Sequence, residues 1–186
     1  MIAEILIVDD NADIRNILKD LISDAGFKTR VAANYNQALK EIDSKLPDVA
    51  ILDVKLDKGD NDGIELLSHI KSKNKDVPVI MISGQQDIAE IINCIEAGAD
   101  DYLFKPFNSV LLRARIKAGI DRKRWHDREE NYRKQLERSE KFIRTIFGRY
   151  LSDDIVSEIL EAPEGLELGG DLREVTILMS DIRGFT

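Results

Sequence analysis

Five short apolar runs alternate with segments of helical periodicity over the first two thirds of the chain, and this alternation constrains the fold most. The runs lie at residues 5–8, 29–32, 49–52, 77–83 and 101–104. Between them, apolar residues recur three and four positions apart, as on one face of an α-helix. Strands that alternate with helices form a parallel sheet covered on both faces. The sequence therefore predicts an α/β fold with a five-stranded, doubly wound parallel sheet.

Glycine and amide residues mark the ends of several predicted helices. Gly26 and Gly98 follow the last apolar residues of the first and fourth helices, where a C-terminal glycine is common. Asn34 and Gln37 have the spacing of a capping box, which predicts that the second helix begins there.

Polar residues that can bind a metal and a phosphate follow four of the five runs. Asp9 and Asp10 come after the first run, Asp53 after the third, Ser83 closes the fourth and Lys105 follows the fifth. The carboxyl ends of parallel strands meet at one edge of the sheet, where ligands bind. Three carboxylates in one cleft repel one another unless a cation neutralises them, and Mg²⁺ prefers such oxygens. The pattern predicts an acidic Mg²⁺ site flanked by two phosphate ligands.

The stretches around these residues resemble the receiver (CheY-like) domains of two-component response regulators. The matching stretches read ILIVDD at 5–10, AILD at 50–53, IMISG at 80–84 and AGADDYLFKP at 97–106. The resemblance covers residues 1–122 and implies the flavodoxin-like receiver fold. It also implies that a sensor histidine kinase is the phosphodonor partner of this chain.

The resemblance assigns a role to each residue of the acidic cluster. It implies that Asp53 is the phosphoacceptor and forms an acyl phosphate. Asp10, Asp53 and the backbone carbonyl of Lys55 are expected to hold Mg²⁺ directly, with Asp9 helping through water. Mg²⁺ is the one cofactor expected.

The same resemblance assigns the residues that respond to the phosphoryl group. Ser83 and Lys105 are expected to bind its oxygens, and Ser83 and Tyr102 to form the conformational switch. The Lys105–Pro106 peptide bond is expected to be cis.

The loop at residues 54–62 departs from the pattern of receiver domains. It is about two residues longer than usual and lacks proline. Two interpretations stay open, a harmless solvated insertion or altered access of a kinase or phosphodonor to Asp53.

A basic segment follows the acidic body of the chain. Residues 109–149 contain thirteen Lys and Arg against six Asp and Glu, whereas the whole chain has a net charge of −8. No helix stop occurs between Pro106 and Gly148, which predicts one long helix. Two heptad positions in it predict a dimeric coiled coil that is weak in its first half. They are occupied by Leu111, Ala118, Trp125, Tyr132, Ser139 and Ile146, and by Arg115, Arg122, Glu129, Leu136, Ile143 and Tyr150.

Other interpretations of this basic segment are a single solvated helix and a nucleic-acid-binding surface. No helix-turn-helix, zinc or aromatic stacking pattern accompanies the charges, so nucleic acid is not the expected partner. The expected partner is a second copy of the chain, paired through the linker helix and the receiver.

The end of the chain resembles the opening of a class III adenylate or guanylate cyclase domain. The matching stretches read FGRYLS at 147–152, LGG at 168–170 and REVTILMSDIRGFT at 173–186. Asp181 and the carbonyl of Ile182 match the first metal-binding element of that family, while Met179 replaces a more usual phenylalanine. The later catalytic residues are absent, so ATP or GTP is expected only in a full-length cyclase, and the expected strand at 175–179 would lack its sheet partners.

These resemblances divide the chain into a receiver at 1–122, a helical signalling linker at 123–150 and a truncated cyclase start at 151–186. The expected function is a phosphorelay response regulator in which phosphorylation of Asp53 controls a cyclase through a dimeric linker. A DNA-binding output and a stand-alone phosphotransfer or scaffold receiver are the alternatives. The lone Cys94, the absence of a run of about 20 apolar residues and the lack of a signal peptide predict a cytoplasmic protein without a membrane partner.

Overall fold

The computed structural model describes residues 2–57, 59, 61–84, 88–148, 156–157, 174 and 176–180. The chain divides into two compact units, Met1–Asn131 and Tyr132–Thr186. The first unit contains the sheet and the first part of the last helix.

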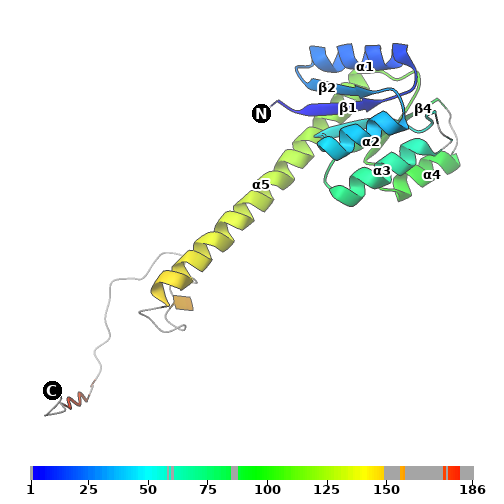
Figure 1. Cartoon of the computed structure of the whole chain (residues 1–186). Helices are drawn as coiled ribbons and strands as arrows, with labels where there is room; N and C mark the ends of the chain where they lie inside the picture. Colours follow the sequence, from blue (N-terminus) through cyan, green and yellow to red (C-terminus); the bar gives the residue numbers. More distant parts are fainter. Residues whose placement is uncertain are drawn as a thin grey trace. The chain divides into compact units, whose positions relative to one another are not determined.

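The first unit is a five-stranded parallel sheet with a helix after each strand (Figure 1). The elements are β1 (Glu4–Val8), α1 (Ala12–Asp24), β2 (Lys28–Ala32), α2 (Tyr35–Ser44), β3 (Val49–Asp53), α3 (Asp62–Lys73), β4 (Val79–Ser83), α4 (Ile88–Glu96), β5 (Asp101–Phe104) and α5 (Ser109–Phe147). The strand order is β2-β1-β3-β4-β5, with all four neighbouring pairs parallel. This confirms the predicted doubly wound, flavodoxin-like fold.

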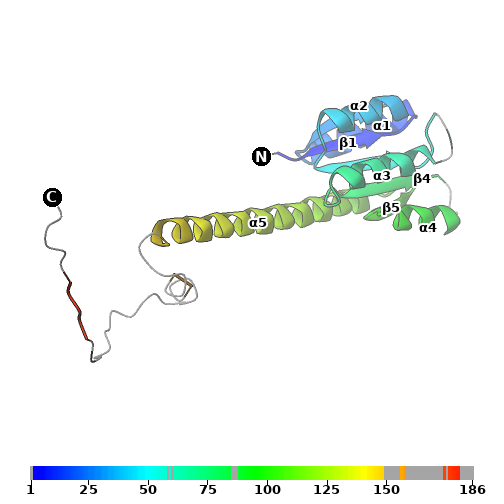
Figure 2. The ribbon, with the colours of Figure 1, turned by 60° about the horizontal axis from the view of Figure 1, so that its bottom comes forward.

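Helices cover both faces of the sheet, and two apolar clusters hold them there (Figure 2). On one face α1 and α5 pack against the sheet, and the buried residues of α5 are Leu112, Ile116 and Ile120. The other face carries α2, α3 and α4, with a single buried residue, Cys94, from α4. Every residue of β3 and β4 is buried, as expected for central strands between two helical layers.

The predicted helix signals lie where the helices begin and end. Gly26 and Gly98 have φ of 84° and 93°, the left-handed conformation that glycine adopts most easily. The Asn34 side chain accepts a hydrogen bond from Gln37 N at 2.9 Å, and Gln37 Oε1 accepts one from Ala33 N at 2.9 Å. The first capping-box bond is therefore present, whereas the reciprocal bond reaches one residue before the cap.

The fourth strand is shorter than the sequence analysis predicts. It begins at Val79 rather than at residue 77. Pro78 has no N–H to donate to a neighbouring strand, although its carbonyl accepts a hydrogen bond from Ala50 N at 2.9 Å. The ladder therefore starts one residue after the proline.

The long helix predicted after Pro106 is present as α5, which has 39 residues. Asn108 caps it, since its side-chain oxygen accepts hydrogen bonds from Val110 N and Leu111 N. Trp125 and Leu136 on this helix are 71% and 58% exposed, so no described residue of the same chain covers them. The continuous helix is thus confirmed, while its pairing into a coiled coil stays a prediction.

The cyclase-like segment contributes few described residues. Residues 176–180 have no regular secondary structure, and Ile177, Leu178 and Met179 are 77%, 91% and 92% exposed. The expected strand is therefore not formed over 176–179. Asp181 and Ile182, named as a metal-site remnant, lie outside the described residues. Among the helices that the structure describes, none is long and apolar enough to cross a membrane.

Candidate functional site

The three aspartates named from the sequence come together at the carboxyl edge of the sheet. Asp53 is the last residue of β3, and Asp9 and Asp10 follow β1 directly. One carboxylate oxygen from each lies within 4.8 Å of the other two. Asp9 and Asp53 are buried, whereas Asp10 is exposed and opens the cluster to solvent. Parallel pairing of β1 with β3 is what brings these chain positions to one place.

Lys105 reaches into this acidic cluster from the end of β5. Its Nζ lies 2.5 Å from Asp53 Oδ2 and 2.7 Å from Asp9 Oδ2. Its backbone N–H donates to the carbonyl of Ser83 at 2.8 Å, so the two predicted phosphate ligands are also joined through the main chain. The Lys105–Pro106 bond is cis, as expected.

Burial and charge act in opposite directions on Asp53. Burial raises the pKa of its carboxyl to about 6, with Asp9 acting in the same direction, while the hydrogen bond and positive charge of Lys105 act against the increase. Burial lowers the pKa of Lys105, but the bonds to Asp53 and Asp9 outweigh it, so the pKa of this ammonium group is raised. Lys105 therefore stays protonated and partly neutralises the cluster.

The surroundings of Asp9 fit a divalent cation. Asp9 Oδ1 accepts a hydrogen bond from Asn11 N at 2.9 Å, which fixes the carboxylate at the start of α1. Among the described residues, buried Asp9 Oδ2 has no polar partner besides Lys105 Nζ, which lies 2.7 Å away as an ion pair. Three carboxyl groups beside one ammonium group offer more oxygen lone pairs than Lys105 can occupy. Hard cations such as Mg²⁺ bind oxygen ligands of this kind.

Tyr102 lies on β5, half-buried between the site and α4. Its hydroxyl donates to Glu90 Oε1 at 2.7 Å. Burial raises the pKa of the Tyr102 hydroxyl; the bond to Ser83 acts against this increase, and the bond to Glu90 adds to it. Both Ser83 and Glu90 thus influence the Tyr102 hydroxyl, and the hydrogen bond to Glu90 links Tyr102 to α4.

The loop after β3 is attached to the body at defined points. Leu56 is buried, Asp57 Oδ1 accepts from Tyr35 N at 3.0 Å, and Asp62 Oδ2 accepts from Gly59 N at 3.0 Å. These contacts tie the described part of the loop to α2 and to the start of α3. Asp57, Gly59 and Asn61 are nevertheless exposed, so both interpretations of the loop, a solvated insertion and altered access to Asp53, stay open.

Several contacts of the site were not anticipated from the sequence. Glu90 bonds to Tyr102, and Arg15 Nη1 donates to the carbonyl of Asp9 at 2.6 Å. A Cβ on Gly63 would lie 2.0 Å from the Asp53 carbonyl oxygen, so α3 begins in direct contact with the backbone of Asp53. The position of Gly63 shortly after Asp53 in the sequence was a signal for this last contact. The other two contacts join residues of different elements, and the sequence carries no signal for them.

Comparison with known proteins identifies the family to which this fold belongs. Residues 5–117 match the family described as the response regulator receiver domain. The chain belongs to this family. Receiver domains bind Mg²⁺ at an acidic pocket, take their phosphoryl group from a histidine kinase and act in two-component systems.

Three similar proteins illustrate the relationship. A putative NtrX-like response regulator of Rickettsia bellii is 45% identical over 106 residues, which are 57% of this chain and 22% of that protein. The phosphate regulon transcriptional regulatory protein PhoB of Escherichia coli is 36% identical over 124 residues, 66% of this chain and 53% of PhoB. A CheY-like receiver domain protein of Methanospirillum hungatei has a crystal structure that matches with a TM-score of 0.64 and 29% identity, covering 68% of this chain and 99% of that structure. The chain thus spans about a fifth of the NtrX-like relative and about half of PhoB.

Proposed function

We propose that this chain is the regulatory part of a phosphorelay response regulator in which Asp53 accepts the phosphoryl group. The observation that carries the proposal is the cluster in which Lys105 Nζ lies 2.5 Å from Asp53 and 2.7 Å from Asp9. Phosphoryl transfer depends on alignment and charge neutralisation more than on covalent help from the protein. A buried carboxylate beside a fixed ammonium group provides both.

The transfer step follows from this geometry. A carboxylate oxygen of Asp53 attacks the phosphorus of a phosphohistidine, a P–O bond forms and the P–N bond breaks. The electron pair of the broken bond stays on the histidine nitrogen, which is left neutral once it is protonated. Lys105 and the Ser83 hydroxyl then bind oxygens of the acyl phosphate, because the transfer brings new negative charge to Asp53.

Mg²⁺ would be held by Asp10, Asp53 and the backbone carbonyl of Lys55, with Asp9 contributing through water. The bound cation supplies charge neutralisation at the phosphoryl oxygens. Calorimetric titration with Mg²⁺ tests the assignment on the unphosphorylated chain. Asp10→Asn should weaken binding severalfold, because one of the direct oxygen ligands loses its charge. Asp13→Asn, a matched change at an exposed position on α1, should leave the affinity unchanged.

Chemical trapping tests the acceptor residue. Borohydride reduces an aspartyl phosphate to homoserine, so reduction after treatment with acetyl phosphate and Mg²⁺ should place homoserine at position 53. Homoserine at position 9 or 10 instead would contradict the assignment of Asp53.

For the output, we propose that phosphorylation controls a class III nucleotide cyclase through a linker dimer. The support is the sequence at 173–186, together with the uninterrupted helix Ser109–Phe147 that leads toward it. Cyclases of this class form their active site between two protomers, so a change in linker pairing would change turnover. The partner proposed for the linker and the receiver is a second copy of the chain.

A DNA-binding output is the second candidate, because PhoB is by name a transcriptional regulatory protein. One experiment on the full-length protein separates the two outputs. Phosphorylated protein should convert Mg-ATP or Mg-GTP to a cyclic nucleotide at a rate different from that of the Asp53→Asn variant. Salt-dependent DNA binding without cyclic nucleotide formation would favour the second candidate. If neither activity occurs, a stand-alone phosphotransfer or scaffold receiver is favoured.

A further inference from the structure

The backbone carbonyl of Asp9 lies where strand β1 leaves the sheet. The strand ends at Val8, and Asp9 N still donates to the Ala32 carbonyl of β2 at 3.3 Å. Asp9 is only 1% exposed, so water has little access to its carbonyl oxygen. Among the described residues, no backbone N–H donates to this oxygen. A buried backbone carbonyl of this kind needs a donor from a side chain.

Arg15, in the first turn of α1, supplies the donor. Its Nη1 donates to the Asp9 carbonyl at 2.6 Å. A hydrogen bond from a guanidinium group is short and strong because its donor is charged. Half-buried Arg15 forms no ion pair with a carboxylate among the described residues, although Asp10 and Asp13 are close to it in the sequence. The guanidinium group is therefore used to hold the main chain of the loop rather than an acidic side chain.

The start of α1 keeps Arg15 in place beside this loop. The Asn11 side-chain oxygen caps the helix, accepting from Asp13 N at 2.9 Å and from Ile14 N at 3.3 Å. Arg15 N donates to the Asn11 carbonyl at 3.1 Å, and Asn11 N donates to Asp9 Oδ1 at 2.9 Å. The loop and the helix start thus form one hydrogen-bonded unit, in which Asn11 fixes the carboxylate of Asp9 and Arg15 fixes its carbonyl.

Asp10 differs from the other two aspartates of the cluster because its side chain has no partner. Asp9 and Asp53 both pair with Lys105, at 2.7 and 2.5 Å. The exposed Asp10 carboxylate forms no hydrogen bond or ion pair with any residue that the structure describes. One of its oxygens nevertheless lies within 4.8 Å of carboxylate oxygens of Asp9 and Asp53. The place of Asp10 in the cluster therefore depends on the backbone that carries it.

The peptide bond between Asp9 and Asp10 connects this carboxylate with Arg15. A peptide unit is planar, so the direction of the Asp9 carbonyl fixes the direction in which the chain continues to the Cα of Asp10. Without the bond from Arg15, this plane would be free to turn, and the Asp10 carboxylate would face the cluster for a smaller part of the time. A ligand group that is already in place binds a cation more tightly than one that must first be ordered.

We infer that Arg15 is a positioning residue for the cation, because it holds the Asp10 carboxylate in the cluster through the carbonyl of Asp9. The inference rests on the proposed Mg²⁺ site and adds to it a residue that does not touch the metal. The loss of Arg15 should then appear in the affinity for Mg²⁺, and not in the rate of phosphorylation once Mg²⁺ is saturating.

Calorimetric titration of the unphosphorylated chain with Mg²⁺ measures this affinity. Arg15→Met keeps most of the length of the side chain but removes its donors, and it should raise the dissociation constant about three- to tenfold. Arg15→Lys retains a charged donor and should recover part of the affinity.

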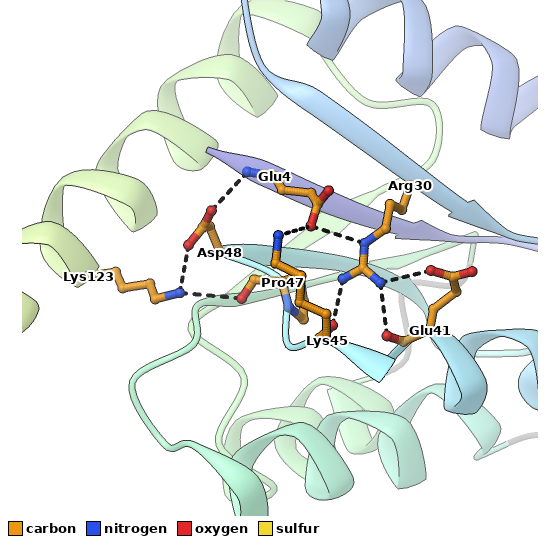
Figure 3. Close-up of polar contacts among 7 residues, drawn as sticks. All are labelled: Glu4, Arg30, Glu41, Lys45, Pro47, Asp48 and Lys123. Carbon is orange, nitrogen blue, oxygen red and sulfur yellow. Dashed lines mark hydrogen bonds and ion pairs between the residues drawn. The ribbon is translucent and has the colours of Figure 1, made fainter. Parts of the chain in front are cut away.

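Arg30→Met is the matched control (Figure 3). Arg30 also donates to backbone carbonyls, at 2.9 Å to that of Glu41 and at 2.6 Å to that of Lys45. Its ion-pair partner Glu4 begins β1, whereas the aspartates of the cluster follow the end of that strand. The substitution should therefore lower the midpoint of urea unfolding and leave the affinity for Mg²⁺ unchanged. A loss of affinity caused only by a weaker fold would appear in both arginine variants.

The Mg²⁺ dependence of phosphorylation by acetyl phosphate gives a second measurement. In Arg15→Met, the Mg²⁺ concentration for half-maximal rate should rise by the same factor as the dissociation constant. The rate at saturating Mg²⁺ should stay within about twofold of that of the unaltered chain, since only the binding of the metal is weakened.

The results that would overturn the inference can be told apart from a failure of the proposed site. An unchanged Mg²⁺ affinity in Arg15→Met, or an equal loss in Arg30→Met, would exclude a positioning role for Arg15. A rate that stays low in Arg15→Met at saturating Mg²⁺ would also exclude it, because Arg15 would then act on the reaction rather than on the metal. An unaltered chain that binds no Mg²⁺ would contradict the proposed site itself and, with it, the inference.

Discussion

At the scale of single residues, the site is defined by a balance between burial and charge at Asp53. Burial favours the neutral carboxyl, whereas Lys105 favours the carboxylate, and the resulting pKa is about 6. Near neutral pH most of the carboxylate is therefore ionised and nucleophilic, although its burial makes the charge costly. A buried carboxyl group with a pKa shifted in this way is typical of a functional site rather than of a stabilising contact.

Replacing Asp53 by Asn should therefore stabilise the protein at neutral pH. A carboxyl whose folded pKa is raised takes up protons on folding, so its ionisation destabilises the fold as pH rises from about 4 to above 6. We expect the free energy of unfolding of Asp53→Asn to exceed that of the unaltered chain by about 1–3 kcal/mol at pH 7.5 in chelator. Lys105 keeps a partner in the variant, because Asp9 lies 2.7 Å away.

Urea unfolding of both chains at several pH values checks this expectation. The difference should fall to roughly half by pH 5, since most of the Asp53 population is then protonated in the folded state. An Asn variant that is less stable at every pH would show that the carboxylate has a structural role.

Tyr102→Phe separates the hydroxyl bonds from the packing of the ring. The ring would keep its contact with Phe104, while the bond to Glu90 at 2.7 Å would be lost. We expect the free energy of unfolding to fall by about 1 kcal/mol. If Tyr102 is part of the switch, the change in fluorescence of Trp125, the single tryptophan of the chain, on phosphorylation should be smaller in the variant than in the unaltered chain. An equal change in the two chains would argue against that role.

The site residues could be predicted from the sequence because they follow predicted strands. Asp9, Asp10, Asp53, Ser83 and Lys105 each stand at a strand end, and parallel pairing brings strand ends together. The contacts made by Glu90 and Arg15 could not be predicted, because the position of a residue on a helix surface does not indicate which residue of another element it contacts.

At the scale of elements, the start of α3 is set by close backbone contact. Gly63 N donates to the Val54 carbonyl at 2.9 Å, and a Cβ at Gly63 would lie 2.0 Å from the Asp53 carbonyl oxygen. The length of the preceding loop was visible in the sequence, whereas its ties to α2 were not. Strand limits were likewise predicted to within a residue or two, with Pro78 accounting for the largest difference.

Gly63→Ala should therefore disturb the site through the backbone of Asp53. The added methyl group must push α3 away from β3, which we expect to lower the free energy of unfolding by more than about 2 kcal/mol and to slow phosphorylation. Gly59→Ala is the control, since the nearest atom to its Cβ would be Asp62 Oδ1 at 3.7 Å. Equal stability of the two variants in urea would contradict this account of the helix start.

The network in Figure 3 joins α5 to the sheet through Lys123, whose Nζ lies 2.8 Å from Asp48 Oδ1, and gives this contact a defined pH dependence. Burial would raise the pKa of Asp48, but the hydrogen bonds from Lys123 and from Glu4 N lower it overall. A lowered folded pKa stabilises the fold above the unfolded pKa of about 3.9, and this contribution is lost as pH falls through the folded value.

Lys123→Met should thus reduce the free energy of unfolding at pH 7 by about 1 kcal/mol or less, because Asp48 is partly exposed and salt screens the pair. The loss should shrink as pH falls from the unfolded pKa of about 3.9 through the lower folded pKa of Asp48. Thermal unfolding at pH 7 and at pH 3 checks this, and a difference that grows on acidification would reverse the predicted sign.

At the scale of the whole molecule, the proposed control of the output requires a linker that pairs with a second copy of the chain. Leu136 and Ile143 occupy a heptad position on α5, and Leu136 is 58% exposed in the single chain. The helix itself was predictable from the absence of breakers before Gly148. Its partner was not, because an apolar stripe does not specify what covers it.

Leu136→Lys combined with Ile143→Lys should convert a linker dimer to a monomer. At both positions, a lysine from each chain would then lie in the buried interface of the coiled coil and repel the other. The dissociation constant of the dimer should therefore rise at least about tenfold. Sedimentation at several concentrations measures this, with Arg138→Ala on the opposite face as control. A chain that is monomeric before any substitution would contradict the proposed linker dimer.

The most direct test of the central claim is the intact mass of the chain after incubation with acetyl phosphate, with and without Mg²⁺, beside the Asp53→Asn variant. We expect one added phosphoryl group on the unaltered chain with Mg²⁺, and none on the variant or without the metal. A phosphoryl group that persists in Asp53→Asn, or that forms equally well without Mg²⁺, would contradict that claim.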